Sequence, residues 1–418
     1  MARLFYGWRM VGAATGMQFL QAALVSNAFG AYVAVLAEER GWSKTALSGA
    51  AALQQMEAAL LGPVLGWLLD RFGAQVFIRA GVFFLGGGLM LLSTVDSLAG
   101  FYGAFVVIAM GASLAGFFPL NVALIHWFER FRARALSSMS LGLAFGGIAA
   151  PLVAWSLQTY GWRPTAFYSG VIAIVVGFPL ALVMRNKPED YGLKVDGMEK
   201  ALAADSERTI GGTPKPITRD FTAREALRTR AFWLLSLGHG FALFVVHTVL
   251  VHAITHLKEG LGYTLAAAAL VMGLVTAFQI VGVMIGWWIG DRFDKRLIAA
   301  ACMLMHAVGL LLLTYALAMP MLVGFAVLHG IAWGLRGPFM QALRADYFGR
   351  ASIGMILGLS YMIIIIGQMG GPLIAGAFAD AHGNYRVGFT LLAILAGLGS
   401  FFFLLARKPS RPLLESAA

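Results

Sequence analysis

The sequence predicts an all-α membrane protein with twelve transmembrane helices in two pseudo-symmetric six-helix bundles. Composition, the succession of long apolar runs and an internal repeat support this prediction. The chain has 418 residues, of which 59% are hydrophobic and only 12% are charged, whereas a soluble domain carries about 25% charged residues. So much apolar surface requires lipid as solvent, and only helices and closed barrels satisfy the backbone in hydrocarbon. The unbroken apolar runs favour helices over the alternating strands of a barrel.

Turn residues and charges mark the boundaries of the apolar runs. The first run is too long for the core of a signal peptide, so we expect it to be a retained span. Cys302 is the single cysteine, which excludes an intrachain disulfide. The predicted spans are 9–36, 46–69, 76–94, 98–126, 135–158, 164–184, 231–256, 264–289, 297–317, 320–344, 352–379 and 386–406.

Lys and Arg residues gather on one side of the predicted membrane. An even number of spans places both ends of the chain on the same side, which receives 25 basic residues against 5 on the other. The positive-inside rule makes the richer side cytoplasmic. We therefore expect cytoplasmic termini in a bacterial inner membrane. The net charge of +11 reflects this topology and does not indicate a nucleic-acid partner.

One long polar stretch divides the spans six and six. Residues 185–230 contain Gly211-Gly212 and Pro214-Lys215-Pro216, which are typical of a flexible linker. We expect a short surface helix near 220–230. The sequence thus predicts an N-terminal bundle in 1–184, a cytoplasmic linker in 185–230 and a C-terminal bundle in 231–418.

The two halves resemble each other at an offset of about 220 residues. Matching short segments recur in the same order along both halves, which indicates duplication of a six-span unit, a pattern typical of transporters. The paired segments are 66–72 with 286–293, 127–128 with 347–348, 147–151 with 367–372, and 160–163 with 382–386.

The loop after the second span resembles a family signature. Residues 66–73 read GWLLDRFG, with glycine, Asp-Arg and glycine at the spacing of the major facilitator superfamily motif between spans two and three. A weaker copy follows the eighth span. The resemblance implies two six-helix halves, alternating access and a gating role for four residues. These are Asp70, Arg71, Asp291 and Arg292.

Further segments are similar to the monocarboxylate transporter and oxalate–formate exchanger branch of that superfamily. They include residues 6–9, which read YGWR, and residues 127–135, which lead into a glycine-rich fifth span. This resemblance implies a secondary transporter of a small organic anion that works as a monomer in the bilayer. Members of the branch often carry a substrate-pairing Arg in the eighth span. Here that span lacks a basic residue, and a charge lies in the tenth span at Arg336.

Arg336 is the leading candidate for substrate binding. A charge inside a span costs at least a few kcal/mol, so such residues usually face a cavity or a partner. A guanidinium binds a carboxylate through two parallel hydrogen bonds. We expect Arg336 to be the counter-charge of an anionic substrate, with a structural pair to Glu57 or helix carbonyls as the alternative.

Three further residues are candidates for proton coupling. Glu57 lies midway along the second span, and His247 and His252 lie in the seventh. Burial raises the pKa of a carboxylate toward neutral pH, and histidine titrates near neutral pH without any shift. Carboxylates in structural ion pairs and histidines that only pack between helices have the same features. The histidines of span seven are scattered around the helix, so no metal site is predicted.

Neutral polar residues within the spans can add hydrogen bonds to a bound carboxylate or join helices to one another. We expect substrate contacts from Asn27, Asn121, Gln341, His247, Tyr361 and Gln368.

The leading function is proton-coupled symport of a small organic anion, with a monocarboxylate as the expected class. The alternatives are anion exchange of the oxalate–formate type and efflux of another small solute. The sequence lacks a Gly-x-x-x-x-Gly-Lys-Ser/Thr phosphate loop, which argues against ATP-driven pumping. We expect no enzymatic activity and no cofactor, because no nucleophile–base pattern or metal-ligand pattern is present.

Overall fold

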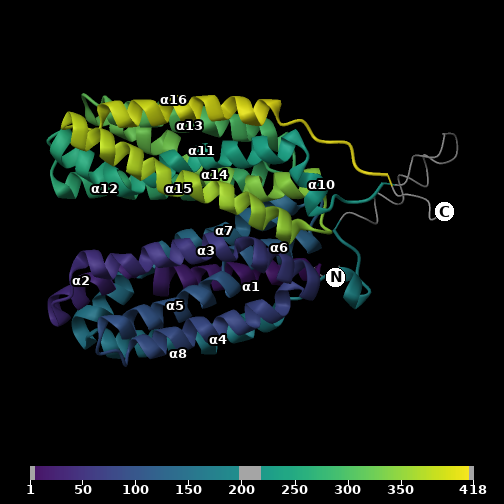
Figure 1. Ribbon diagram of the computed structural model, residues 1–418, viewed down its shortest axis with the longest axis horizontal. Helices are drawn as coiled ribbons and strands as arrows, with labels where there is room; N and C mark the ends of the chain where they lie inside the picture. The colour runs from purple at the N-terminus through teal and green to yellow at the C-terminus, as the bar shows by residue number, and fades with distance from the viewer. Residues whose placement is uncertain (1–4, 197–217, 414–418) are drawn as a thin grey trace. The chain divides into compact units, whose positions relative to one another are not determined.

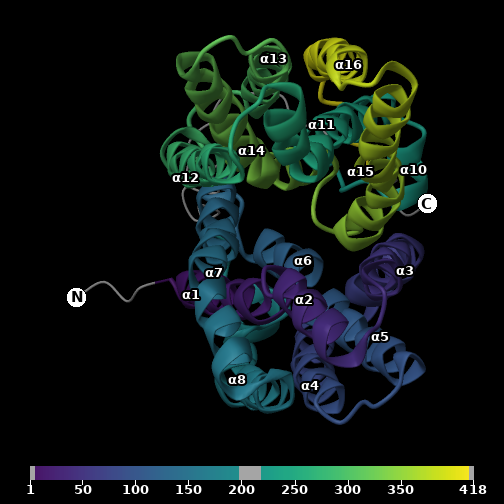
Figure 2. The ribbon, with the colours of Figure 1, turned by 90° about the vertical axis from the view of Figure 1, so that its left-hand side faces the viewer.

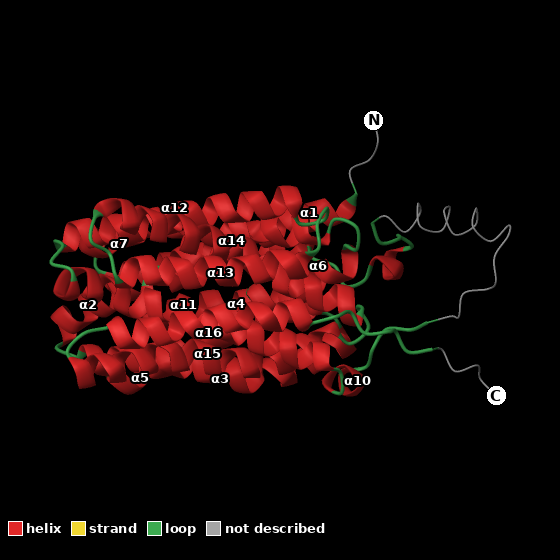
Figure 3. Ribbon diagram, turned by 90° about the horizontal axis from the view of Figure 1, so that it is seen from above, coloured by secondary structure: helices red, strands yellow, loops and turns green. Residues whose placement is uncertain are grey.

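The computed structural model describes residues 5–196 and 218–413 of the chain. Within these ranges every multi-residue element is a helix, as Figure 3 shows, and a single isolated bridge joins Thr218 to Leu413. Part of the predicted linker, residues 197–217, lies outside the described residues.

The N-terminal half contains six spans, two of which are built from more than one helical piece. Their elements are α1 (Tyr6–Gln21), η1 (Ala22–Ser26) and α2 (Phe29–Arg40), then α3 (Lys44–Phe72), α4 (Ala74–Leu92), α5 (Leu98–Ala115) with α6 (Phe117–Trp127), α7 (Arg132–Tyr160), α8 (Trp162–Val183) and the short η2 (Pro188–Tyr191).

The C-terminal half repeats the pattern after the short helix α10 (Ala223–Leu227), which agrees with the helix expected near 220–230. Its spans are α11 (Arg230–Thr255) with η3 (His256–Gly260), α12 (Leu265–Ile289), α13 (Lys295–Thr314), α14 (Met319–Phe348), α15 (Ile353–His382) and α16 (Arg386–Leu405).

Eleven helical segments of the described chain are long and apolar enough to cross a membrane. The remaining predicted span is α3, which has 29 residues but carries Gln54, Gln55 and Glu57 near its centre. These polar residues lower its hydropathy without shortening the helix. The twelve-helix architecture predicted from the sequence is therefore confirmed.

Local signals explain where the spans begin and end. Side-chain oxygens of Ser43, Ser97 and Thr264 accept hydrogen bonds from backbone N–H groups of the first helical turns that follow them, which satisfies donors that have no intrahelical partner. At the opposite ends, Gly161 and Gly383 have φ of 82° and 69°, a conformation that favours glycine. These two glycines occupy matching positions in the repeat.

Two spans predicted as continuous are interrupted. The first contains a π-helical turn at Ala22–Ser26 followed by a turn at residues 27–28. The fourth breaks at Gly116, whose extended backbone (φ −93°, ψ −153°) separates α5 from α6. Pro119 then lies in the first turn of α6, where its missing N–H carries no cost. Short π segments often occur at functional sites.

The described chain separates into two compact units. The N-terminal unit comprises Met1–Pro216 together with Ile353–Gly358, and the C-terminal unit comprises Ile217–Ser352 with Leu359–Ala418. In the first unit α4 packs against α5 and α8, and α1 packs against α7. In the second, α14 packs against α12 and α13, and α16 packs against α13 and α11 (Figures 1 and 2). The domain limits predicted from the sequence remain a prediction.

The two described ends of the linker are attached in the same way. The Asp196 carboxylate accepts backbone hydrogen bonds from Glu129 and Phe131 in the loop after α6. The Asp220 carboxylate accepts backbone hydrogen bonds from residues 350–351 in the loop after α14. These loops correspond at the repeat offset of about 220. The duplication therefore includes the aspartate that attaches each end of the linker to a loop of its own half.

Candidate functional site

Asp70, at the end of α3, caps another helix. The backbone N–H groups of Gly354 and Met355, in the first turn of α15, donate to its two carboxylate oxygens at 2.7 Å each. All three residues belong to the N-terminal unit. A carboxylate at a helix N-terminus satisfies orphan donors and interacts favourably with the helix dipole. Asp70 is therefore bound to the start of α15 rather than to its neighbour Arg71.

Glycines allow α3 and the first turn of α15 to approach backbone to backbone. A Cβ at Gly66 would clash with the carbonyl of Gly354, and a Cβ at Gly358 would clash with the carbonyl of Gly62. Small residues four apart permit such close helix contacts. This contact places the amides of α15 within reach of Asp70.

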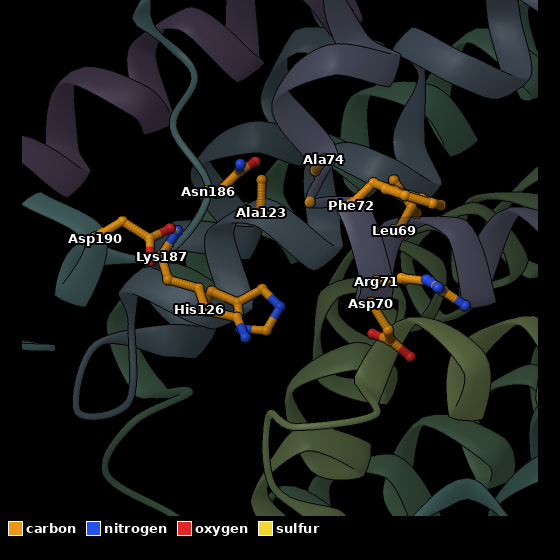
Figure 4. A pocket seen from close by; sticks show the side chains of 11 residues that line it. Leu69, Asp70, Arg71, Phe72, Ala74, Ala123, His126, Asn186, Lys187 and Asp190 are labelled. Atoms are coloured by element: carbon orange, nitrogen blue, oxygen red, sulfur yellow. Dashed lines mark hydrogen bonds between the residues drawn. The ribbon is translucent and has the colours of Figure 1, made fainter.

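A cavity of about 220 Å³ lies beside Asp70 in the N-terminal unit. Figure 4 shows its lining, in which the Asp70 carboxylate is directed toward α15 and the Arg71 side chain points elsewhere. His126, Lys187 and Asp190 supply the other titratable groups. The lining combines acidic and basic groups, so it does not select one sign of ligand charge.

Arg71 and Arg292 have equivalent surroundings in the two halves. The Arg71 guanidinium lies 5.3 Å from the ring centroid of Trp67, and Arg292 lies 5.2 Å from that of Trp288. Each arginine therefore stacks on a tryptophan four residues earlier, and such cation–π contacts contribute about 0.5–1 kcal/mol at exposed sites. Asp291 and Arg292 lie in the turn between α12 and α13.

Arg336 is buried inside the C-terminal unit. Its exposed fraction is 1%, and its Nε and Nη1 atoms have no hydrogen-bond partner among the described residues. The helix continues for about twelve residues to Phe348, which places Arg336 roughly 18 Å from that end at 1.5 Å per residue. The helix therefore ends four residues beyond the predicted end of the span at 344, and Arg336 lies correspondingly further from it.

Several titratable side chains lie within electrostatic reach of Arg336. They include His247, nominated from the sequence, and His239, both on α11. His306 and Cys302 on α13 and His329 on α14 interact with the same guanidinium. Sequence reasoning did not single out His306 or His329, because each is an isolated histidine in an apolar run.

Arg344, at the predicted end of span ten, is buried within the C-terminal unit. Its exposed fraction is 1%. Its Nε donates to Ser360 Oγ at 3.0 Å, and its Nη1 donates to the Met340 carbonyl at 2.8 Å. The helix extends beyond residue 344 and turns this side chain inward, where those oxygens compensate the charge.

The other C-terminal candidates differ in how they are held. His252 Nε2 lies 3.0 Å from the carbonyl of Pro372 on α15, so it joins two helices. The Tyr361 hydroxyl lies beside the Gln368 side chain, while the buried Gln368 Oε1 has no hydrogen-bond partner within the described chain. Gln341 is half-buried on α14, five residues after Arg336.

The N-terminal candidates lie on α3, on α6 and in the break before α2. Ser113 Oγ donates to Glu57 Oε2 at 2.8 Å, and no described residue hydrogen-bonds to the buried Glu57 Oε1. Asn121 is 1% exposed and donates through Nδ2 to the Phe117 carbonyl at 2.6 Å. Its Oδ1 has no partner in the part of the chain that the structure describes. Asn27 is exposed at the end of the π-helical turn, and its Nδ2 donates to the Ala22 carbonyl at 3.0 Å.

Comparisons with known proteins agree with this architecture. A family model described as Major Facilitator Superfamily matches residues 14–289 and 240–418. Monocarboxylate transporter 13 of Rattus norvegicus is 26% identical over 427 residues, covering 97% of this chain and 92% of the relative. Glycerol-3-phosphate transporter of Bacillus subtilis (strain 168) is 26% identical over 373 residues, covering 85% of this chain and 82% of the relative.

A solved structure of the proton:xylose symporter XylE shares the fold, with a TM-score of 0.74, 17% identity and coverage of 98% of both chains. These similarities confirm the prediction of a multi-pass membrane transporter rather than an enzyme. The resemblance to the monocarboxylate transporter branch is supported by near full-length similarity. The chain belongs to the Major Facilitator Superfamily.

Proposed function

We propose that this transporter moves a small organic anion, with a monocarboxylate as the favoured class, in symport with a proton by alternating access. Arg336 is the counter-charge for the anion. The chain acts as a monomer in a bacterial inner membrane, with its termini in the cytoplasm. The charge asymmetry between the two sides of the predicted spans supports this orientation.

The observation that carries the proposal is the burial of Arg336 with two unpartnered donors. Leaving a buried charged group without hydrogen bonds costs several kcal/mol. A carboxylate oxygen accepts from a guanidinium N–H in a charge-assisted hydrogen bond. An anion bound to Arg336 therefore compensates the cost of burying this charge.

The relatives support an anionic cargo. The rat relative is named for monocarboxylates and the Bacillus relative for glycerol 3-phosphate, and both similarities cover most of this chain. The fork of Arg336 suits either a carboxylate or a phosphate. We favour the carboxylate because the more extensive of the two similarities is to the monocarboxylate transporter.

Further polar groups are assigned to substrate binding and proton coupling. We assign hydrogen bonds to the substrate to Asn27, Asn121, Gln341, His247, Tyr361 and Gln368. The coupled proton is assigned to Glu57, His247 and His252, of which Glu57 has an unpartnered buried oxygen and His252 is tied to the α15 backbone.

Gating is assigned to the two Asp-Arg pairs, residues 70–71 and 291–292. The capping of α15 by Asp70 supports this role, because such contacts commonly break and re-form when a protein switches state. Arg71 and Arg292, stacked on aromatic rings, remain available to exchange partners during the switch.

Counterflow of radiolabelled lactate, pyruvate, formate and oxalate in proteoliposomes tests the proposal. Truncating one partner of a buried charge pair costs about 2–5 kcal/mol, so Arg336→Gln should weaken anion binding by at least about 30-fold. Arg336→Lys keeps the charge without the fork and should lie between Gln and wild type. The matched control is Arg386→Gln, an exposed arginine at the start of α16.

Wild-type activity in Arg336→Gln would refute the role of this arginine. Accumulation driven by an imposed pH gradient separates symport from exchange. An exchanger gives counterflow that does not respond to the gradient, and a transporter of another solute class gives no counterflow with any of the four acids.

A further inference from the structure

Two buried histidines face each other in the C-terminal unit. His306 on α13 and His329 on α14 are both 0% exposed, and their Nδ1 atoms lie 3.1 Å apart. The ring centroids are 4.7 Å apart with the planes inclined at 66°. Each Nε2 atom is buried without a partner among the described residues. The pair therefore shares one hydrogen bond and has two unused nitrogens.

This geometry fixes the protonation pattern of the neutral pair. A neutral imidazole carries one N–H, and its other nitrogen accepts. One ring must donate its Nδ1–H to the Nδ1 of the other. The donor ring then has a free lone pair on Nε2, and the acceptor ring has its proton on Nε2. The pair can thus bind one additional proton without breaking the bridge between the rings.

We propose that the His306–His329 pair is a proton relay that couples proton movement to anion binding at Arg336. A proton binds the free Nε2 of the donor ring, whose Nδ1 proton passes across the 3.1 Å bridge to the other ring. The second ring then releases its own Nε2 proton. One proton enters and one leaves, and both tautomers are exchanged. This proposal rests on the proposed anion transport.

Arg336 links the relay to the substrate. It lies on α14 seven residues after His329, two helical turns away on the same face, and its charge acts on both histidines. Because like charges repel, a proton on the pair is opposed while Arg336 is unpaired. An anion bound to the guanidinium cancels that repulsion. The pair therefore accepts and passes on a proton only while the anion is bound, which couples proton movement to anion transport.

In the described C-terminal spans the acidic residues lie near the helix ends, so the bound anion supplies the charge that neutralises Arg336. Spans α11, α12, α13 and α16 carry no Asp or Glu between their first and last residues. On α14, Asp346 lies near the far end and pairs with Lys295 at 2.8 Å. On α15, Asp380 is exposed near the end of the helix. Among the described residues, the other titratable groups that interact with Arg336 are not acidic side chains, and they are His239, His247, Cys302 and Arg344.

Asparagine at either position tests the relay. An asparagine side chain can replace Nδ1 in the bridge, but it cannot carry a proton. His306→Asn and His329→Asn should therefore keep counterflow within about twofold of wild type while accumulation driven by a pH gradient falls to the level seen without a gradient. The probe is whichever of lactate, pyruvate, formate and oxalate gives the largest wild-type counterflow. The control is His256→Gln, a buried histidine whose Nε2 contacts the Leu313 carbonyl.

Each outcome decides the question. Gradient-driven accumulation at the wild-type level in both asparagine variants overturns the relay. Misfolding of both variants, seen as loss of a monodisperse purified protein, also overturns it, because the pair would then be needed for packing. If a folded variant loses counterflow, proton uptake during anion binding to purified protein decides, and uptake equal to wild type is contrary to the proposal. Failure of wild type itself to move any of the four acids refutes the proposed function instead.

Discussion

The cap that Asp70 places on α15 gives the sharpest quantitative prediction. Its two oxygens accept the N–H groups of Gly354 and Met355 at 2.7 Å each. Hydrogen bonds to a charged group contribute about 1.5–3 kcal/mol each, and the charge at the helix N-terminus adds about 0.3–1 kcal/mol. Asp70→Asn keeps one acceptor oxygen but loses the charge and one bond, which is a loss of about 2 kcal/mol or more.

Amide hydrogen exchange measures this loss directly, because it reports the free energy of local opening. A loss of about 2 kcal/mol corresponds to roughly 30-fold faster exchange of the amides of Gly354 and Met355, since 1.4 kcal/mol is a factor of ten. Asp70→Ala removes both acceptors and should accelerate exchange further. Asp380→Asn, which removes an exposed carboxylate near the other end of α15, is the matched control.

The reasoning fails if peptides covering 352–358 exchange at the wild-type rate in both Asp70 variants. It also fails if Asp380→Asn produces the same acceleration, because the effect would then reflect charge on the helix rather than the cap. Protection elsewhere in the N-terminal unit should stay within a few-fold of wild type.

Three further changes test other parts of the structure. Gly66→Ala should lower the free energy of unfolding of the detergent-purified protein by about 1–3 kcal/mol, because its Cβ clashes with the first turn of α15. The control Gly87→Ala, whose Cβ meets nothing within 4 Å, should leave it unchanged. Arg344→Gln should lower the free energy of unfolding by about 3 kcal/mol or more, measured by thermal denaturation; a wild-type melting temperature would show that its buried hydrogen bonds contribute little. Hydrogen bonds from Arg219 lower the pKa of Glu225 from 4.5 to about 2, so its stabilisation of α10 should be complete above pH 4.5 and lost as the pH falls toward 2; amide exchange of residues 223–227 that is unchanged over this range would contradict it.

The sequence alone determined the twelve spans, because helices in lipid must be long, apolar and internally hydrogen-bonded. It also determined the duplication. In the structure, matching positions of the two halves hold Gly161 and Gly383, both with positive φ, and two arginines that stack on tryptophans. Both features depend on residues close in the chain or on regular spacing. Such local information can be read without coordinates.

Tertiary structure decided what depends on distant residues. Asp70 binds amides 284 and 285 positions away, and no local signal identifies that partner. In the sequence His306 and His329 are isolated histidines, and only the packing of α13 on α14 brings their Nδ1 atoms together. In the sequence Arg344 is a charge at the end of a span. In the structure the helix continues past it, and its guanidinium donates to Ser360. In each case the physical reason is the same: apolar periodicity predicts that a helix forms, but the direction and partner of a polar side chain depend on the neighbouring helix against which it packs.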